Sequence, residues 1–525
     1  MTPQSRATMH QTAFAAAALA AILSGCAATT TGSNSSEQTK RPACDAGALS
    51  TMWEKTRDMA EGLDAKPMIS KLPPCPYAKS NEAIGDERDI ANMRVSHGIV
   101  AVPRLTQYAN AVLEKLKSAS GASQIPGKVY VVANDQLDAA ATADGNVYVS
   151  LGYFRNLDNE DQLAALLAHE LSHVLLRHHD SSWFGRFTKQ AMSYFEDTAM
   201  VRNALDRAME GDFGGGKALT PSQKATLDKM NFLVKLNDRA LHPAWGRRQE
   251  AEADRLGTDL LMRAGYSFSD GMQAWLAKVA AYDDQQRAVR QELASQRQAT
   301  IDALAAQGKV EASVRKAADG ALKDLLEDVG RSHEDGTNRL RELNGYIEKA
   351  YNDNIDAPDA QVTSHRQVMT MPDVKGTLDG YREAFRARSQ ILALQPAAAV
   401  AALRKLTSGG PIASHALPNY LLFEAQAKAR PAEREPALRR SLAASEPIWN
   451  SVESSAQFYS GRNPKELAAI GRKALRDFQN APSAYPRLIS WYSRVGLKDE
   501  AASVLEDCRR NEAQMRSACE KALKI

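Results

Sequence analysis

The chain has 525 residues, and its 66 Lys and Arg against 63 Asp and Glu leave a formal net charge of +3 at pH 7. So small an excess over this length gives no basis for nucleic-acid binding, and no segment after the N-terminal one is apolar enough to cross a membrane. The length is enough for two or three domains. An aromatic content of 6%, with frequent Ala, Arg, Gln and Glu, indicates a mostly helical protein.

Residues 1–25 have the pattern of a bacterial lipoprotein signal peptide. An apolar run at 13–23, too short to span a bilayer as a helix, is followed by Leu-Ser-Gly-Cys ending at Cys26. This tetrad resembles the lipobox, whose cysteine becomes the acylated first residue; the alternative is an ordinary signal peptide with a chance cysteine. Residues 26–43 are then a flexible tether. Because Ala27 rather than Asp follows the cysteine, the resemblance implies a lipid anchor in the outer membrane, facing the periplasm.

Four further cysteines suggest disulfides. They are Cys44, Cys75, Cys508 and Cys519. An even number in an oxidising compartment favours two disulfides, and of the three possible connectivities we prefer the sequence-local one, Cys44–Cys75 and Cys508–Cys519. The alternative is four buried thiols. None has the paired short spacing of a thiolate zinc site.

Between residues 44 and 149 the hydrophobic pattern changes from one typical of helices to one typical of strands. Amphipathic helical patterns cover 44–126, including one that begins at Pro103. β-branched and aromatic residues at 129–132 and 147–149, with Asp144-Gly145 as a turn before the second run, predict a small sheet. Farther on, the glycine-rich stretch 211–216 is expected to be a surface loop or a mobile flap.

Residues 169–173 read His-Glu-Leu-Ser-His, within a segment whose leucines and valines at 163–175 recur at helical spacing. Histidines four apart lie on one face of a helix, so both imidazoles can reach one metal ion. Glu170 points about 100° round the axis, where it can take a proton from a metal-bound water. The pattern predicts a metal site with His169 and His173 as ligands. The alternative is a helix whose histidines are only core or surface residues.

A catalytic zinc ion of this kind needs a third protein ligand, with one position left for water. Residues 247–257 read Arg-Arg-Gln-Glu-Ala-Glu-Ala-Asp-Arg-Leu-Gly. On a helix Glu250 and Asp254 share one face, whereas Glu252 lies roughly 200° from Glu250. Only one of the two glutamates can therefore face the metal.

Taken together, these motifs resemble the CAAX prenyl endopeptidase and HtpX-like zinc metallopeptidases, a branch of the gluzincins. The match covers roughly 85–265, although Ala143-Asp144-Gly145 replaces the Pro-Gly-Gly that the family carries before its central strand. The resemblance implies that Glu250 is the third ligand. It also implies that Asp254 orients a ligand histidine from outside the coordination sphere. Glu252 is then expected on a solvated helix face.

Residues 271–356 are charged and helical, and we interpret them as a long arm that completes or covers the cleft, by intramolecular packing or as a coiled coil with a partner. Ser332-His333, with Arg339 six residues after the histidine, resembles a later element of soluble, periplasmic family members. The resemblance implies that His333 stabilises the oxyanion or is a regulatory metal ligand; the alternative is a surface histidine. The histidines expected to be structural or solvent-exposed are His178, His179, His242 and His365.

The predicted fold is mainly α with a small β-sheet. An α+β gluzincin-type metallopeptidase domain at 44–270 precedes the arm at 271–356 and a helical C-terminal domain at 357–525. Within this last domain the spacing of apolar and small residues over 484–511 is typical of one tetratricopeptide repeat. A single unit does not establish an array, because stacked repeats need neighbours to bury their faces.

These features predict a zinc-dependent endopeptidase of the bacterial cell envelope, with one Zn²⁺ per chain. Zinc would activate a water, Glu170 would move its proton, and the substrate backbone would pair with an edge strand near Val147–Ser150. By resemblance the substrates are misfolded or unassembled envelope proteins, and the outer-membrane assembly machinery is a candidate partner. The alternative is a chaperone-like or scaffold lipoprotein that binds outer-membrane clients through its helical C-terminal region and has only latent protease activity.

Overall fold

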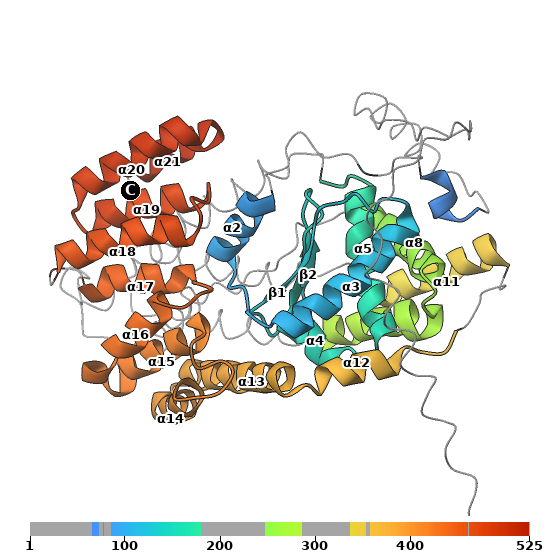
Figure 1. Cartoon of the computed structure of the whole chain (residues 1–525), viewed down its shortest axis with the longest axis horizontal. Coiled ribbons are helices and arrows are strands. Elements are labelled where there is room, and N and C mark those ends of the chain that lie inside the picture. The colour runs from blue at the N-terminus through green and yellow to red at the C-terminus, as the bar shows by residue number, and fades with distance from the viewer. Residues whose placement is uncertain are drawn as a thin grey trace, which may run out of the picture. The chain divides into compact units, whose positions relative to one another are not determined.

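The computed structural model describes residues 66–72, 77, 86–179, 247–285, 336–352, 358–459, 461 and 463–523 (Figure 1). All of them belong to one compact unit, which spans 45–525. In agreement with the predicted fold class, these residues are mostly helical and include one small sheet. No helix within the described ranges has the length and apolar character needed to cross a membrane.

The sheet has three strands, β1 (Val129–Val132), β2 (Ala139–Ala141) and β3 (Val147–Ser150), in the order β1-β3-β2. β1 runs parallel to β3, and β2 runs antiparallel to it. The two strands predicted from their β-branched residues are confirmed, as is the turn before β3, where Gly145 has a φ of 82°.

The expectation that Val147–Ser150 is an edge strand is wrong. β3 is the central strand, buried along its whole length and paired on both sides. Its apolar run is the pattern of a strand covered on both faces, which periodicity alone does not distinguish from an edge strand. Of the two outer strands, β1 is bridged by Ile99, which pairs with Val132. In the described part of the chain, no further strand pairs with the outer edge of β2.

Helices cover both faces of the sheet. Val131, Ala139 and Val149 belong to the main core, where α3 (Pro103–Ser120) packs against β1 and α5 (Glu160–Leu175) packs against β2. Tyr148 and Ala140 face the other way, into a small cluster that includes residues of α2 (Asp86–Ser96). The short helix α4 (Leu151–Asn156) follows β3 directly.

The central helix of this region is α5, which is buried from Asp161 to Leu175. The side chain of Asn159 caps it by accepting a hydrogen bond from the amide of Gln162. α8 (Arg247–Arg263) packs along α5, and Gly257 lies against the backbone of Ala168 and His169. A Cβ atom at Gly257 would lie 3.0 Å from the amide nitrogen of His169, so a larger residue would force the two backbones apart.

Further segments pack around α8. A π-helical turn, η2 (Phe268–Gln273), leads into a helical stretch at 274–285. α11 (Gly336–Tyr351) and the short 3₁₀ helix η1 (Met68–Lys71) both contact α8. Asp259 joins them, because it accepts hydrogen bonds from the hydroxyls of Tyr346 and Tyr351 and from the amide of Ile69.

Within its described residues, the C-terminal region has helices as its regular elements. Its elements are α12 (Val362–Met369), α13 (Pro372–Leu392), α14 (Pro396–Thr407), α15 (Ala416–Ala429), η3 (Pro431–Glu433), α16 (Glu435–Leu442), α17 (Trp449–Tyr459), α18 (Pro464–Asp477), α19 (Ala484–Arg494), α20 (Lys498–Asn511), η4 (Ala513–Met515) and α21 (Arg516–Ala522). From α13 to α20, each helix packs against the next one along the chain. Several proline residues stand in the first turn of these helices, where a missing amide hydrogen costs nothing.

The stretch predicted to resemble a tetratricopeptide repeat forms the helical hairpin of α19 and α20. Leu488, Tyr492 and Leu505 are buried in its core, and Gly496 lies in the connecting turn with a φ of 79°. The predicted disulfide between Cys508 and Cys519 is present and joins α20 to α21. That this hairpin is a tetratricopeptide repeat stays a prediction.

Several predicted features lie outside the described residues. They are the signal peptide and tether with Cys26, the proposed Cys44–Cys75 pair, the glycine-rich stretch 211–216, His242, and His333.

Candidate metal centre

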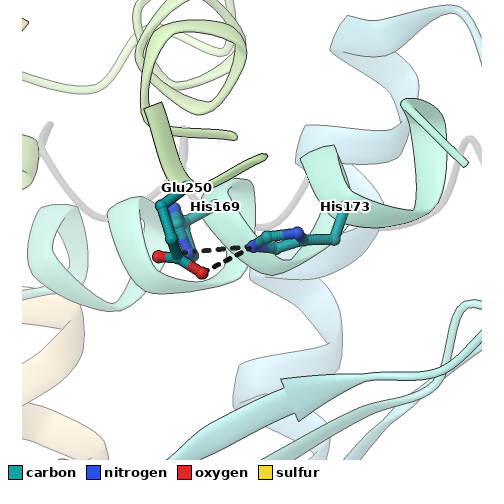
Figure 2. Close-up of side chains that lie close together, drawn as sticks. All are labelled: His169, His173 and Glu250. Atoms are coloured by element: carbon teal, nitrogen blue, oxygen red, sulfur yellow. Dashed lines mark hydrogen bonds and ion pairs between the residues drawn. The ribbon is translucent and has the colours of Figure 1, made fainter. Parts of the chain in front are cut away.

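Three buried side chains converge between α5 and α8 (Figure 2). The Nε2 atoms of His169 and His173 lie 3.2 Å apart, on successive turns of α5. The carboxylate of Glu250, from α8, places Oε2 3.5 Å from Nε2 of His169 and Oε1 3.7 Å from Nε2 of His173. Each of the three residues offers one ligand atom, and these atoms lie within 4.8 Å of one another. Within the described ranges, this is the group of side chains that could hold a metal ion.

The spacing of the three ligand atoms fits a tetrahedral ion. Zinc bonds of about 2.0–2.2 Å to nitrogen and oxygen put neighbouring ligand atoms about 3.4 Å apart in a tetrahedron. The observed separations of 3.2, 3.5 and 3.7 Å bracket that value. Two imidazoles and one carboxylate also form a donor set suited to zinc, with a fourth position left for water.

Both histidines are in the chemical form that binds a metal. Burial lowers the pKa of His169, although the hydrogen bond to Asp254 opposes this shift. Burial and the neighbouring His169 imidazole hold the pKa of His173 well below its usual range. Both rings are therefore neutral at physiological pH, and each can offer a lone pair to a cation.

A carboxylate and a guanidinium hold the first histidine in place. Oδ1 of Asp254 lies 2.9 Å from Nδ1 of His169. Arg339, on α11, donates to both oxygens of Asp254 at 2.8 and 2.6 Å and lies 3.2 Å from Oε2 of Glu250. Burial opposes ionisation of Asp254, but Arg339 outweighs it and lowers the pKa of that carboxyl to about 2. Arg339 thus offsets part of the negative charge that the two acidic side chains bring into the interior.

The remaining walls of the site are partly aromatic. The ring of Trp275, fully buried in the stretch 274–285, lies 5.2 Å from the ring of His169 and 5.7 Å from the guanidinium of Arg339. Glu170, the predicted base, is fully buried on α5. Burial and the negative charge of Glu170 raise the pKa of Tyr153 well above its usual value, so its hydroxyl stays protonated.

The structure contradicts the expectation that Glu252 lies on a solvated face. Its side chain is 12% exposed and contacts His178, and Arg248 donates to it. His178 is itself buried, 2.8 Å from His173. The helical spacing correctly predicts that Glu252 points away from Glu250. It does not predict that His178 packs against that face of α8. Sequence reasoning also missed Trp275, for which no motif provides a signal.

Residues 103–347 match the model of peptidase family M48. The chain carries an M48 peptidase domain. The resemblance drawn from the sequence is thereby confirmed at the level of the family. The match begins at residue 103 and continues past 265 to 347, so that α11 and Arg339 fall inside the M48 domain. Members of this family are metallopeptidases, so the domain implies a divalent metal.

Three relatives illustrate the similarity. A beta-barrel assembly-enhancing protease of Escherichia coli (strain K12) is 30% identical over 212 residues, which are 38% of this chain and 39% of that protein. The protein of the same name from Yersinia pestis is 29% identical over 200 residues, 38% of this chain and 37% of its own length. The mitochondrial metalloendopeptidase OMA1 of Schizosaccharomyces pombe is 34% identical over 73 residues, 14% of this chain and 22% of that protein. The chain therefore matches well under half the length of each.

Proposed function

We propose that this protein is a zinc-dependent endopeptidase in which His169, His173 and Glu250 hold one zinc ion. The observation that carries the proposal is the convergence of two neutral imidazoles and a carboxylate at tetrahedral spacing, inside a domain of a peptidase family. The placement of Asp254 and Arg339 behind His169 and Glu250 supports it, because metal ligands are commonly oriented by such partners.

The chemistry divides between the ion and the protein. Zinc held at this position would polarise the scissile carbonyl and lower the pKa of a water ligand. Glu170 precedes the second histidine by three residues, on the same buried helix, and serves as the base. Its carboxylate accepts the proton of the attacking water and returns it to the nitrogen of the leaving amine. Tyr153, kept protonated next to Glu170, is a hydrogen-bond donor within the same region.

We place the substrate along β2 rather than β3, since β2 is an outer strand and packs against α5. The amide of Thr142 donates to the carbonyl of Asn146, and the amide of Ser150 donates to the carbonyl of Asp138. These two bonds show which residues of β2 are hydrogen-bonded to β3. Residues of even number therefore bond to β3, and the backbone groups of Ala139 and Ala141 point to the outer edge. An extended peptide could add to this edge as a further strand.

One experiment tests the enzymatic proposal directly. Purified protein is analysed for metal content and for degradation of casein, with wild type and Glu170→Gln compared. We expect about one zinc per chain in both proteins and proteolysis in the wild type alone, because the base is not a ligand. Wild-type protein without zinc, or a Glu170→Gln variant that cleaves casein at the wild-type rate, would show the proposal to be wrong.

We further propose that the protease acts in the bacterial envelope on misfolded or unassembled proteins, including those handled by the outer-membrane assembly machinery. Two relatives that carry the name beta-barrel assembly-enhancing protease support this substrate class. The lipobox-like tetrad ending at Cys26 supports an outer-membrane lipid anchor facing the periplasm. Cys26→Ser should release the protein from the membrane fraction or leave it uncleaved; wild-type protein free in the periplasm with an unmodified N-terminus would refute the anchor.

The alternative of a chaperone-like or scaffold lipoprotein is not favoured. It treats the protease site as latent, whereas the ligand cluster is intact and the match to a peptidase family covers the residues that build it.

A further inference from the structure

The second histidine of the cluster has a partner that the mechanism above does not use. Nδ1 of His173, the ring nitrogen that faces away from Glu250, lies 2.8 Å from Nδ1 of His178. Both side chains are buried, His173 fully. A hydrogen bond at this distance between two ring nitrogens requires that one carries the proton and the other accepts it.

The end of α5 brings these two rings together. The amide of His178 donates to the carbonyl of His173, and the amide of Arg177 donates to that of Val174. Arg177 has a φ of 54°, in the left-handed region. This is the hydrogen-bonding pattern of a Schellman motif, in which the residue after the left-handed one packs over the third residue from the helix end. The two residues in this contact are usually apolar, but here they are His178 and His173.

A chain of contacts continues from His178 to α8. Nε2 of His178 lies 3.2 Å from Oε2 of Glu252, and Nε of Arg248 donates to the other oxygen at 2.8 Å. The carboxylate of Glu252 therefore lies between a guanidinium and an imidazole. A guanidinium can only donate, and a carboxylate paired with it is the acceptor for the imidazole as well.

The positions of the protons follow from this acceptor. Because the carboxylate of Glu252 accepts, Nε2 of His178 is the donor in that contact, and its Nδ1 is left to accept from His173. His173 must then donate from Nδ1, which leaves the lone pair of its Nε2 directed at Glu250 and His169. The opposite arrangement would put a proton on Nε2 of His173, where it would exclude a metal ion.

We propose that His178 and Glu252 are positioning residues, which hold His173 in the one tautomer and orientation that can bind the metal. The inference rests on the proposed function, because it assigns His173 as a ligand. With it, each of the two histidines is held by a separate carboxylate with its own arginine. Asp254 and Arg339 hold His169, while Glu252 and Arg248 hold His173 through His178.

The test measures zinc affinity by chelator competition, and the absorption spectrum after Co²⁺ replacement, in full-length wild type, His178→Leu, His178→Asn and Glu252→Ala. Loss of a partner that orients a ligand typically lowers metal affinity 10- to 100-fold. We expect such a loss and an altered Co²⁺ spectrum for His178→Leu. His178→Asn should lose less, since its amide oxygen can still accept from Nδ1 of His173. Glu252→Ala, at a partly exposed position, should lose about tenfold.

The double variant distinguishes an effect of Glu252 that acts through His178 from general damage to the fold. If Glu252 acts through His178, then His178→Leu combined with Glu252→Ala should bind zinc no more weakly than His178→Leu alone. His365→Asn is the matched control, because His365 is also a buried histidine but lies away from the cluster. Its zinc affinity should equal that of the wild type, whatever its thermal unfolding temperature.

Each outcome bears on a different statement. The positioning role of His178 and Glu252 would be wrong if His178→Asn and Glu252→Ala both bound zinc as tightly as the wild type. It would also be wrong if the losses of zinc affinity were strictly additive in the double variant. Either result would leave the proposed function intact. Wild-type protein that binds no zinc would overturn both. If His178→Leu does not fold without metal, as judged by circular dichroism, Glu252→Ala and His178→Asn decide the question.

Discussion

Oδ1 of Asp254 lies 2.9 Å from Nδ1 of His169, on the opposite side of the ring from the Nε2 atom that faces Glu250. The same carboxylate accepts two hydrogen bonds from Arg339, so the acid cannot rotate away from the histidine. A buried arginine on α11 therefore controls the orientation of an imidazole on α5 through an aspartate on α8.

The first prediction follows from this relationship. Asp254→Asn should lower zinc affinity by about tenfold or more, because the neutral amide gives up the charge that attracts both Arg339 and the proton on Nδ1 of His169. Chelator competition measures the affinity. Asp499→Asn, at an exposed position on α20, serves as the control and should leave zinc binding unchanged. Equal affinity in Asp254→Asn and wild type would show that Asp254 does not position the ligand.

The second prediction concerns the two glutamates of α8. Glu250→Ala should lower metal occupancy far more than Glu252→Ala, because only the carboxylate of Glu250 lies among the ligand atoms. Metal analysis of the two purified variants after dialysis gives the comparison. The reverse order of metal loss would make Glu252 the third ligand and would contradict the geometry of the site.

The third prediction tests the close approach of α5 and α8. Gly257→Val should destabilise the fold by about 1–3 kcal/mol, as overpacking does, and should weaken zinc binding by moving Glu250 away from α5. The atoms nearest to an added Cβ are backbone atoms of Ala168 and His169, which cannot rotate aside. Gly345→Ala is the matched control, since an added Cβ there meets nothing within 4 Å. It should stabilise α11 by up to about 1 kcal/mol. An unfolding temperature of Gly257→Val equal to that of the wild type would show that a larger side chain fits between α5 and α8.

The fourth prediction addresses the substrate strand. A ladder against β2 uses every second amide of an extended peptide, because only Ala139 and Ala141 point to the outer edge. N-methylation of a peptide substrate, one position at a time, should therefore lower kcat/KM about tenfold at alternate residues. The positions between them should change little. A loss that shows no alternation would mean that the peptide does not bind as a strand.

The fifth prediction is a pH dependence of stability. Asp89, on α2, accepts hydrogen bonds from Thr142, Asn146 and Tyr148, yet burial raises its pKa from 3.8 to about 6. The raised pKa means that its contribution to stability is present below about pH 4 and is lost as the pH rises through about 6. Since one pKa unit is worth about 1.4 kcal/mol, the loss amounts to about 3 kcal/mol.

Asp89→Asn should remove that loss. Its thermal unfolding temperature, relative to that of the wild type, should rise between pH 4 and pH 7, whereas Asp499→Asn should follow the wild type at every pH. Parallel curves for Asp89→Asn and wild type would show that Asp89 ionises normally in the folded protein.

The sequence alone determined those parts of the site that depend on local geometry. The four-residue spacing of His169 and His173 puts both on one helix face, and the spacing of Glu250 and Glu252 turns them apart, whatever surrounds the helix. The strands at 129–132 and 147–149 and the turn at Gly145 follow from local preferences for the same reason. The disulfide of Cys508 and Cys519 spans a separation of only 11 residues, so it too was within reach of a sequence argument.

Only the tertiary structure decided which of these faces meet. Periodicity states that a helix has an apolar face but not what packs against it, so β3 was mistaken for an edge strand, although it lies between β1 and β2. For the same reason Glu252 was expected in solvent, whereas the left-handed turn at Arg177 folds His178 back between His173 and that glutamate. The meeting of His178 and Glu252 joins residues 74 positions apart, and no local preference of the chain encodes such a contact.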